Sequence, residues 1–358
     1  MSFYFWLTAS SILLSLIFIL LDKKVFKIGD TNLKARQASH SKPTSRLGGA
    51  AILISCALFS FILTGFSEWQ LFITVVPLFF MGLLEDLGFN NSAKVRLLIA
   101  ALSSAIGIFL FEAWLSNIDT IGLDWLLSFP IIGILFTIFA IVGLVNAINL
   151  IDGVNGLASG QVIISSFAIS IVAMKVGESN IANLALIIGF STLGLFLINY
   201  PFGYLFLGDA GAYTLGFLLA WMLVLLSHRH PELSDWALLS IVIWPVADTL
   251  LAAFRRKFNS VSPGQPDRLH FHQLTMRAWR ILSKRKISQK VANPLSAATI
   301  LPLAALPASG GALFCFNATI SALIAVTSLL FFFIAYFFII YLVLSARRKT
   351  FFKINWLS

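Results

Sequence analysis

Long uninterrupted runs of apolar residues recur along the whole chain, and they constrain its fold more than any other feature. A run of about 20 apolar residues is long enough to cross a bilayer as a helix. Only helices or closed barrels satisfy every backbone group in lipid, and these runs are too long and too evenly apolar for barrel strands. About eleven such segments can be identified, at residues 3–21, 47–65, 70–86, 95–111, 124–147, 158–175, 182–199, 211–227, 236–254, 295–315 and 320–345. The sequence therefore predicts an all-α, polytopic integral membrane protein, with residues 1–358 forming a single transmembrane domain.

The composition excludes a large soluble domain. Hydrophobic residues make up 59% of the chain and charged residues only 11%, whereas soluble proteins are roughly half apolar and a quarter charged. A net charge of +10 would suggest a nucleic-acid partner in a soluble protein, but here the basic residues flank helix ends, where they set topology and meet lipid headgroups. Cys56 and Cys315 lie inside apolar segments, so they indicate packing and neither a disulfide nor a metal site. The first segment lacks an A-x-A-like cleavage motif, so we expect a retained helix and not a signal peptide.

The basic residues predict how the chain is oriented. All of the 25 Lys and Arg residues except Lys175 and Arg229 lie in, or at the helix ends beside, alternate connections between the apolar segments. Connections rich in Lys and Arg stay in the cytosol. These connections are residues 22–46, 87–94, 148–157, 200–210 and 255–294, with the tail from 346. We therefore expect an outer N-terminus, a cytosolic C-terminus and every polar motif on the cytosolic face.

Two adjacent carboxylates, Glu85 and Asp86, end the third apolar segment. Acids are costly beside hydrocarbon, and neighbouring acids repel unless a cation or a proton is shared between them. The pair is either an interfacial cap of that helix or a site for a divalent cation or a base.

A second polar motif connects the fifth and sixth segments and contains Asn149, Asp152, Gly153 and Asn155. Asn, Asp and Gly favour tight turns, and glycine lets the backbone approach a ligand closely. An ordinary turn between helices is the alternative, but an apolar turn would not need so many polar side chains.

Two further acids stand out. Asp209, between Gly208 and Gly211 at the start of the eighth segment, is either a helix N-cap or a Mg²⁺ ligand. Asp248 lies inside the ninth segment, where it either pairs with Arg255 or Arg256 or faces the polar centre of the bundle.

The longest connection, 255–294, contains the sequence Asp267-Arg268-Leu-His270-Phe-His272. Without cysteines nearby, phosphate contact or proton transfer fits this cluster better than zinc binding. A basic loop lying on the membrane surface is the alternative. Residues 269–282 have the pattern of a short basic amphipathic helix.

Carboxylates, glycine turns and Arg and His donors at one membrane face fit phosphoryl transfer around a metal-bound diphosphate. A Walker-type loop is absent from the sequence, which argues against an ATP-driven pump.

In this order, the motifs resemble those of the polyprenyl-phosphate N-acetylhexosamine-1-phosphate transferases of glycosyltransferase family 4. This bacterial family includes the lipid I synthase and the enzymes that initiate O-antigen, common-antigen and teichoic-acid synthesis. The similarity runs through Arg36, His40, Pro43 to Gly49, Glu85-Asp86, Ser92 to Leu97, the loops around Asp152 and Asp209, and Asp267 to His272.

The resemblance implies about eleven helices around a cytosol-facing cleft in the inner (plasma) membrane. It implies that undecaprenyl phosphate attacks a UDP-sugar with Mg²⁺ (or Mn²⁺), releasing UMP, and it leaves a homodimer open. It further implies catalytic roles for Glu85, Asp86, His270 and His272, metal binding by Asp209, and substrate binding by a larger set. That set is Asn149, Asp152, Asn155, Phe206, Arg268 and Lys94.

Three positions depart from the family pattern, namely Glu85 for Asp, Asn155 for a second Asp, and Gln273 for a last His. These departures argue against the lipid I enzyme and favour an O-antigen-type member that serves lipopolysaccharide or another envelope glycan. The alternatives are a secondary transporter that uses intramembrane acids such as Asp248, a catalytically idle scaffold, and a phospho-MurNAc-pentapeptide transferase of the same family.

Overall fold

The computed structural model describes residues 2–23, 44–64, 69–89, 91–258, 269–284 and 286–355. Over these ranges the chain is helical, and its only bridge outside helices is an isolated parallel pair, Ser45 with Leu205. The predicted all-α fold is confirmed. The helices are α1 (Ser2–Leu21), α2 (Gly48–Thr64), α3 (Trp69–Asp86), α4 (Ala93–Phe111), α5 (Leu123–Leu127), α6 (Pro130–Ile151), α7 (Leu157–Lys175), α8 (Ser179–Asn199), α9 (Gly208–Arg229), α10 (Asp235–Ile241), α11 (Ile243–Phe258), α12 (Phe271–Leu282), α13 (Gln289–Leu313) and α14 (Ala318–Asn355).

The protein is a multi-pass membrane protein. In the described part of the chain, 10 helical segments are long and apolar enough to cross a bilayer, with α10 and α11 acting together as one of them. The apolar helix α2 is shorter than the others. Each of the predicted segments therefore corresponds to one helix or to two consecutive helices, while the number eleven itself stays a prediction.

The predicted segment 124–147 is divided into two helices near its start. Short helix α5 ends at Leu127, and α6 begins only at Pro130. A proline has no backbone N–H and clashes with the preceding turn, so it is tolerated at the first position of a helix but not in its interior. Pro130 therefore separates one predicted helix into two.

The predicted segment 236–254 is interrupted at Val242, between α10 and α11. The cause is Pro245, which cannot donate the helical hydrogen bond to the carbonyl of Ile241. The hydroxyl of Ser165 on α7 donates to that carbonyl instead, at 3.1 Å. A neighbouring helix thus satisfies the backbone group that the proline leaves without a partner, as a break inside a membrane requires.

Helix α9 is the central helix of the bundle. Every residue from Ala210 to Leu226 is buried, and α9 packs against α2, α3 and α6. Small residues let these backbones approach closely. A Cβ on Gly49 of α2 would meet Gly211 at 2.2 Å, and one on Gly82 of α3 would meet Ala210 at 2.4 Å. Side chains are therefore excluded where α2 and α3 touch the start of α9.

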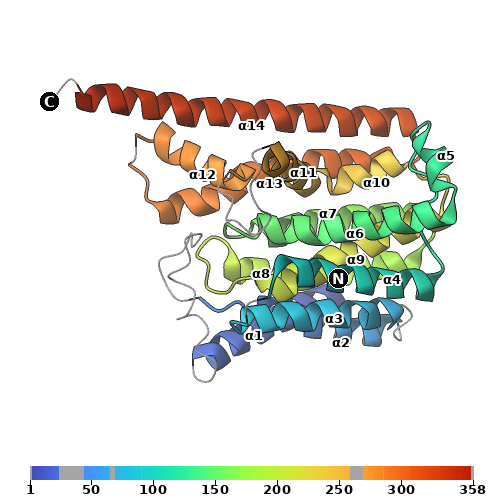
Figure 1. The fold of residues 1–358 in the computed structure, drawn as a ribbon. Helices are drawn as coiled ribbons and strands as arrows, with labels where there is room; N and C mark the ends of the chain where they lie inside the picture. Colours follow the sequence, from blue (N-terminus) through green and yellow to red (C-terminus); the bar gives the residue numbers. More distant parts are fainter. Residues whose placement is uncertain are drawn as a thin grey trace.

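The two ends of the bundle differ in character. Figure 1 places α12 at one end and α5 at the other. The connections after α3, α6 and α8 reach the end with α12, so the polar motifs gather there, as the sequence predicts. Helix α12 is the expected amphipathic helix, and its apolar face packs against α13 and α14.

Candidate active site

Asp86, the last residue of α3, binds the first turn of α9. Its side chain is fully buried, and its two oxygens accept the backbone N–H groups of Asp209 and Ala210, each at 2.9 Å. The first N–H groups of a helix have no partner within the helix, and a negative charge is stabilising there. Asp86 is thus a cap, but of α9 and not of the helix to which it belongs.

Glu85 points into a different set of contacts. It accepts the hydroxyl hydrogen of Tyr213 at 3.0 Å and lies 3.2 Å from the guanidinium Nε of Arg96. Arg96 also reaches the Tyr213 hydroxyl at 3.4 Å. Lys94, the cation that the resemblance placed in the substrate site, has an exposed side chain near the start of α4. Arg96 is therefore the cation that the fold brings to Glu85.

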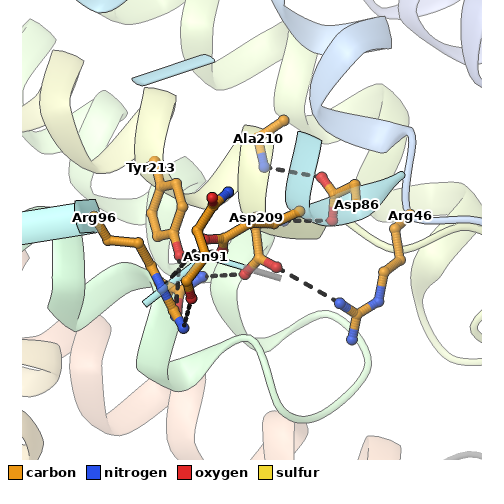
Figure 2. A network of polar contacts seen from close by, with 9 residues as sticks. Arg46, Asp86, Asn91, Arg96, Asp209, Ala210 and Tyr213 are labelled. Carbon is orange, nitrogen blue, oxygen red and sulfur yellow. Dashed lines mark hydrogen bonds and ion pairs between the residues drawn. The ribbon is translucent and has the colours of Figure 1, made fainter. Parts of the chain in front are cut away.

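Asp209 is not an N-cap, which excludes that alternative. It is the second residue of α9, and its carboxylate accepts from the amide of Asn149 at 2.7 Å while lying 3.6 Å from Arg46. Figure 2 shows this carboxylate between Arg46 on one side and Arg96 with Tyr213 on the other. Asp209 joins the α6–α7 motif and the segment before α2 at one point, and its side chain is 23% exposed.

Arg46 is fixed by backbone pairing between two segments far apart in sequence. The N–H of Phe206 donates to Ser45 at 2.9 Å, and the N–H groups of Gly48 and Gly49 donate to Phe206 and Leu207 at 3.0 and 2.8 Å. The Pro-Thr-Ser-Arg-Leu-Gly-Gly motif is thus bonded to the Phe-Leu-Gly-Asp motif. Phe206 reaches the site through its backbone, and its ring is half-buried.

Asp152 ends α6 and completes the acidic group. Burial raises the pKa of this carboxyl to about 7, with nearby Asp209 adding to the rise, while Arg46 and the backbone N–H of Gly208 lower it. Its ionisation near neutral pH thus depends on the charges around it. A cation bound beside it would favour the ionised form.

Asn155 is buried and holds two connections together. Its backbone N–H donates to Asn293 of α13 at 2.8 Å, and its side-chain amide donates to the Pro201 carbonyl at 2.8 Å. Its side-chain oxygen has no hydrogen-bond partner among the described residues. Asn199 makes a parallel link, since it accepts from Gly156 and donates to Leu205 at 2.7 Å.

The two predicted histidines lie at the start of α12, both buried. Their rings stack in parallel, with centroids 5.8 Å apart and planes 9° apart. A Cβ on Gly153 would lie 2.3 Å from His272 Nε2, so the absence of a side chain there lets the histidine contact the α6–α7 motif. Asp248 faces His270, with its Oδ2 3.3 Å from Nδ1 of that ring. Arg268 lies outside the described residues, as do Arg36, His40 and Pro43.

The donor set fits Mg²⁺ held partly by a substrate. Among the described residues, no three His, Cys, Asp or Glu side chains form a ready metal cage. Mg²⁺ usually takes one or two carboxylates, with substrate phosphates and water as its other ligands. Asp209 and Asp152 can supply such carboxylates, whereas both oxygens of Asp86 are already occupied by backbone N–H groups.

Comparison with known proteins finds similarity to one family over part of the chain. A model of glycosyl transferase family 4 matches residues 68–227. Over this range, which is less than half of the chain, the protein is similar to glycosyl transferase family 4. The undecaprenyl-phosphate alpha-N-acetylglucosaminyl 1-phosphate transferase of Yersinia pestis is 28% identical over 277 residues, covering 74% of this chain and 75% of that enzyme. The enzyme of the same name from Salmonella typhi is 28% identical over 291 residues, covering 76% and 77%. The one from Escherichia coli K12 is 29% identical over 211 residues, which is 56% of each chain.

The match to glycosyl transferase family 4 contains most of the site, from Glu85 to Asp209, and ends before the histidines of α12. The family resemblance predicted from the motifs is confirmed. The sequence interpretation gave no role to Arg96, Tyr213, Asn199 or Asn293. Arg96 and Tyr213 had a usable signal, because each is a polar residue at the motif-bearing end of an apolar segment.

Proposed function

We propose that this protein is a member of glycosyl transferase family 4 and transfers N-acetylglucosamine-1-phosphate from its UDP-sugar to undecaprenyl phosphate. In this reaction a phosphate oxygen of the lipid attacks the β-phosphorus of the UDP-sugar. A new P–O–P bond forms, the bond between the two phosphates of the donor breaks, and UMP leaves. The product is the first lipid-linked sugar of an envelope glycan. The names of the relatives from Yersinia, Salmonella and Escherichia support undecaprenyl phosphate as the acceptor and N-acetylglucosaminyl 1-phosphate as the transferred group.

One observation carries the proposal. Two guanidinium groups, Arg46 and Arg96, lie on either side of Asp209 and Glu85 at the end of the bundle where the motif-bearing connections meet. Phosphoryl transfer depends mostly on positioning and on neutralising the charge of the phosphates. Arginine offers planar, paired donors that match phosphate oxygens. Asp209 pairs with Arg46, and Glu85 pairs with Arg96. The two guanidinium groups therefore lie at separate positions, which suits two phosphate-bearing substrates.

The lipid phosphate needs little help from a base. The second pKa of a phosphate monoester is about 6, so at neutral pH most of it is already a dianion. Asp86 is poorly suited to take a proton because both of its oxygens accept backbone N–H groups. We therefore assign Asp86 to holding the first turn of α9, and Glu85 to orienting Arg96 and Tyr213 toward the lipid phosphate.

A bound Mg²⁺ would supply charge neutralisation and Lewis-acid polarisation at the diphosphate. Asp209 would hold it, with Asp152 as the second candidate ligand. Asn149 keeps the Asp209 carboxylate in place through its 2.7 Å hydrogen bond. Asn155 and Phe206 line the adjoining connections, where we place the uridine, and the histidines of α12 meet the diphosphate from the side of Gly153.

The test is release of UMP by the purified protein. Undecaprenyl phosphate is supplied in detergent with a panel of UDP-sugars, including UDP-N-acetylglucosamine, UDP-N-acetylgalactosamine and UDP-MurNAc-pentapeptide. We expect UMP and a lipid-linked sugar only with an N-acetylhexosamine donor. Turnover with the pentapeptide donor would reassign the protein within its family. No UMP with any donor, from folded protein, would leave the transporter or scaffold alternative.

We also propose that the site faces the cytosol, where UDP-sugars are made. Lys175 and Arg229 end α7 and α9, at the opposite end of the bundle from α12, and no other Lys or Arg lies in the outer connections. Single cysteines placed at 230 and 268 test the orientation with an impermeant thiol reagent in intact cells. Labelling at 230 alone is expected, and labelling at 268 alone would reverse the orientation.

A further inference from the structure

Asp248 is a buried carboxylate to which the reaction outlined above gives no role. It lies in the second turn of α11, and its side chain is only 2% exposed. A charge inside a membrane span is costly unless it is paired, so such residues mark functional positions. Its Oδ1 accepts the backbone N–H of Phe271 at 3.2 Å, and its Oδ2 lies 3.3 Å from Nδ1 of His270. Asp248 thus meets the start of α12 with both oxygens.

The first of these contacts is a helix cap supplied by another helix. His270 is the N-cap residue of α12, and its side chain makes no capping hydrogen bond. Phe271 is the first residue of α12, and its N–H would have no partner within the helix. A carboxylate satisfies it and is stabilised by the positive end of the helix dipole. This contact explains why α12 begins where it does.

A cap alone does not explain the second contact. Oδ2 of Asp248 has no hydrogen-bond partner among the described residues, and it faces Nδ1 of His270. A histidine with a carboxylate at one ring nitrogen keeps its proton there, which determines what the other nitrogen can do. In His270 that other nitrogen is Nε2, on the far side of the ring from Asp248.

The histidine pair reaches the proposed site through His272. Its Nε2 lies against Gly153, the neighbour of Asp152, and its ring stacks on that of His270. Burial lowers the pKa of His272 to about 4, with His270 lowering it further and Asp248 opposing the change. His272 is therefore a neutral ring at pH 7, and His270 is the member of the pair that contacts Asp248.

We propose that Asp248 is a positioning residue that holds a proton on Nδ1 of His270 and so presents Nε2 to the diphosphate. The inference rests on the transferase function proposed above. It assigns Asp248 a role through His270 and no contact with either substrate. The distance of 3.3 Å is slightly longer than a usual hydrogen bond, and such contacts commonly tighten when substrate binds.

Replacing Asp248 with Asn separates positioning from capping. The Asn oxygen can still accept from Phe271, so the cap remains. Its NH₂ group would face Nδ1 of His270 and favour the tautomer with the proton on Nε2. In serine hydrolases the same change in an Asp–His pair lowers kcat by about 10⁴-fold. Here we expect D248N to lower kcat by at least about 100-fold, with a thermal midpoint near wild type and a KM for the UDP-sugar changed by less than about threefold.

Asp235→Asn is the matched control. Asp235 is the acid at the opposite end of the same membrane span, where α10 begins, far from α12, and its backbone N–H donates to Asp119. D235N should keep the rate. If D248N turns over within about twofold of wild type, Asp248 is a cap only and the proposal fails. Failure of the wild-type protein to release UMP would instead refute the transferase function.

A spectroscopic measurement tests the proposal without turnover. The chain has only 5 histidines, so ¹⁵N-labelled histidine in the purified full-length protein gives few signals, and His270→Gln identifies the one from residue 270. Nitrogen shifts report which ring atoms carry protons. We expect Nδ1 of His270 to be protonated in wild type and unprotonated in D248N. An unprotonated Nδ1 in wild type overturns the proposal whether or not the protein is active.

Discussion

The contact between Asp86 and α9 predicts a specific effect of Asp86→Asn. An amide has one oxygen, so it can accept from Asp209 or Ala210 but not from both. One buried backbone N–H would then lose its partner and face an NH₂ group. Hydrogen bonds to charged groups contribute about 1.5–3 kcal/mol each, and a negative charge at a helix N-terminus adds about 0.3–1 kcal/mol.

Together these effects amount to about 2–4 kcal/mol, which corresponds to about 30- to 900-fold in rate if the first turn of α9 must be ordered for turnover. The same loss should lower the thermal unfolding midpoint, because the contact belongs to the folded protein and not only to the reaction. The assay measures UMP release and thermal unfolding on the same detergent-purified samples. Glu85→Gln, one residue earlier in α3, is the matched control and should keep its unfolding midpoint.

Two outcomes would refute this reasoning about Asp86. If D86N keeps both its rate and its unfolding midpoint, the two hydrogen bonds do not hold the turn. If D86N unfolds like wild type but loses its rate, the carboxylate acts on the lipid phosphate, as the family resemblance implies, and the positioning role is wrong.

Three further predictions concern Glu85, Asp209 and Asp152. Glu85→Gln should lower kcat strongly with little change in UDP-sugar affinity, because Arg96 loses its ion pair. Glu85→Asp should keep substantial activity. A wild-type rate in the Gln variant would mean that Glu85 is only an interfacial residue. Asp209→Asn and EDTA should each abolish UMP release, and full turnover in either case would remove Asp209 as the metal ligand. Because burial raises the pKa of Asp152 to about 7, kcat/KM should rise with pH through a limb near pH 7. Arg46 lowers that pKa, so Arg46→Gln should move the limb to higher pH, and an unmoved limb would contradict the assignment to Asp152.

The membrane spans could be predicted from the sequence because length and hydropathy decide them almost alone in lipid. The position of the motifs at one end of the bundle could also be predicted, because they lie in alternate connections between the membrane spans. The helix breaks before Pro130 and at Val242 were not predicted, although Pro130 and Pro245 carried the signal in the sequence. A hydropathy window averages across such breaks.

The contacts within the site could be predicted less well, because they depend on packing between distant segments. Asp86 caps a helix that begins more than a hundred residues later, as the separation of 123 positions between Asp86 and Asp209 shows. For Asp248 the sequence left open an ion pair with a nearby arginine or a position facing the polar centre of the bundle, and it did not indicate the contact with His270. The sequence alone could have shown that Lys94 and Arg96 do not both face the site, since residues two apart on a helix point about 200° away from each other.

The backbone contacts of α9 determine which parts of the protein can move when a lipid enters. Gly49 and Gly82 touch α9 with no side chain between the backbones, so these helices cannot slide past one another without a clash. The amides in the first turn of α9 should therefore be among the slowest to exchange with solvent in a hydrogen-exchange experiment, and fast exchange there would contradict this view. Helix α12, in contrast, is joined to the bundle by side chains from α11, α13 and α14. Asp86 and Asp209 thus lie where helix backbones pack directly against each other, whereas the histidines lie on a helix that is held through side chains.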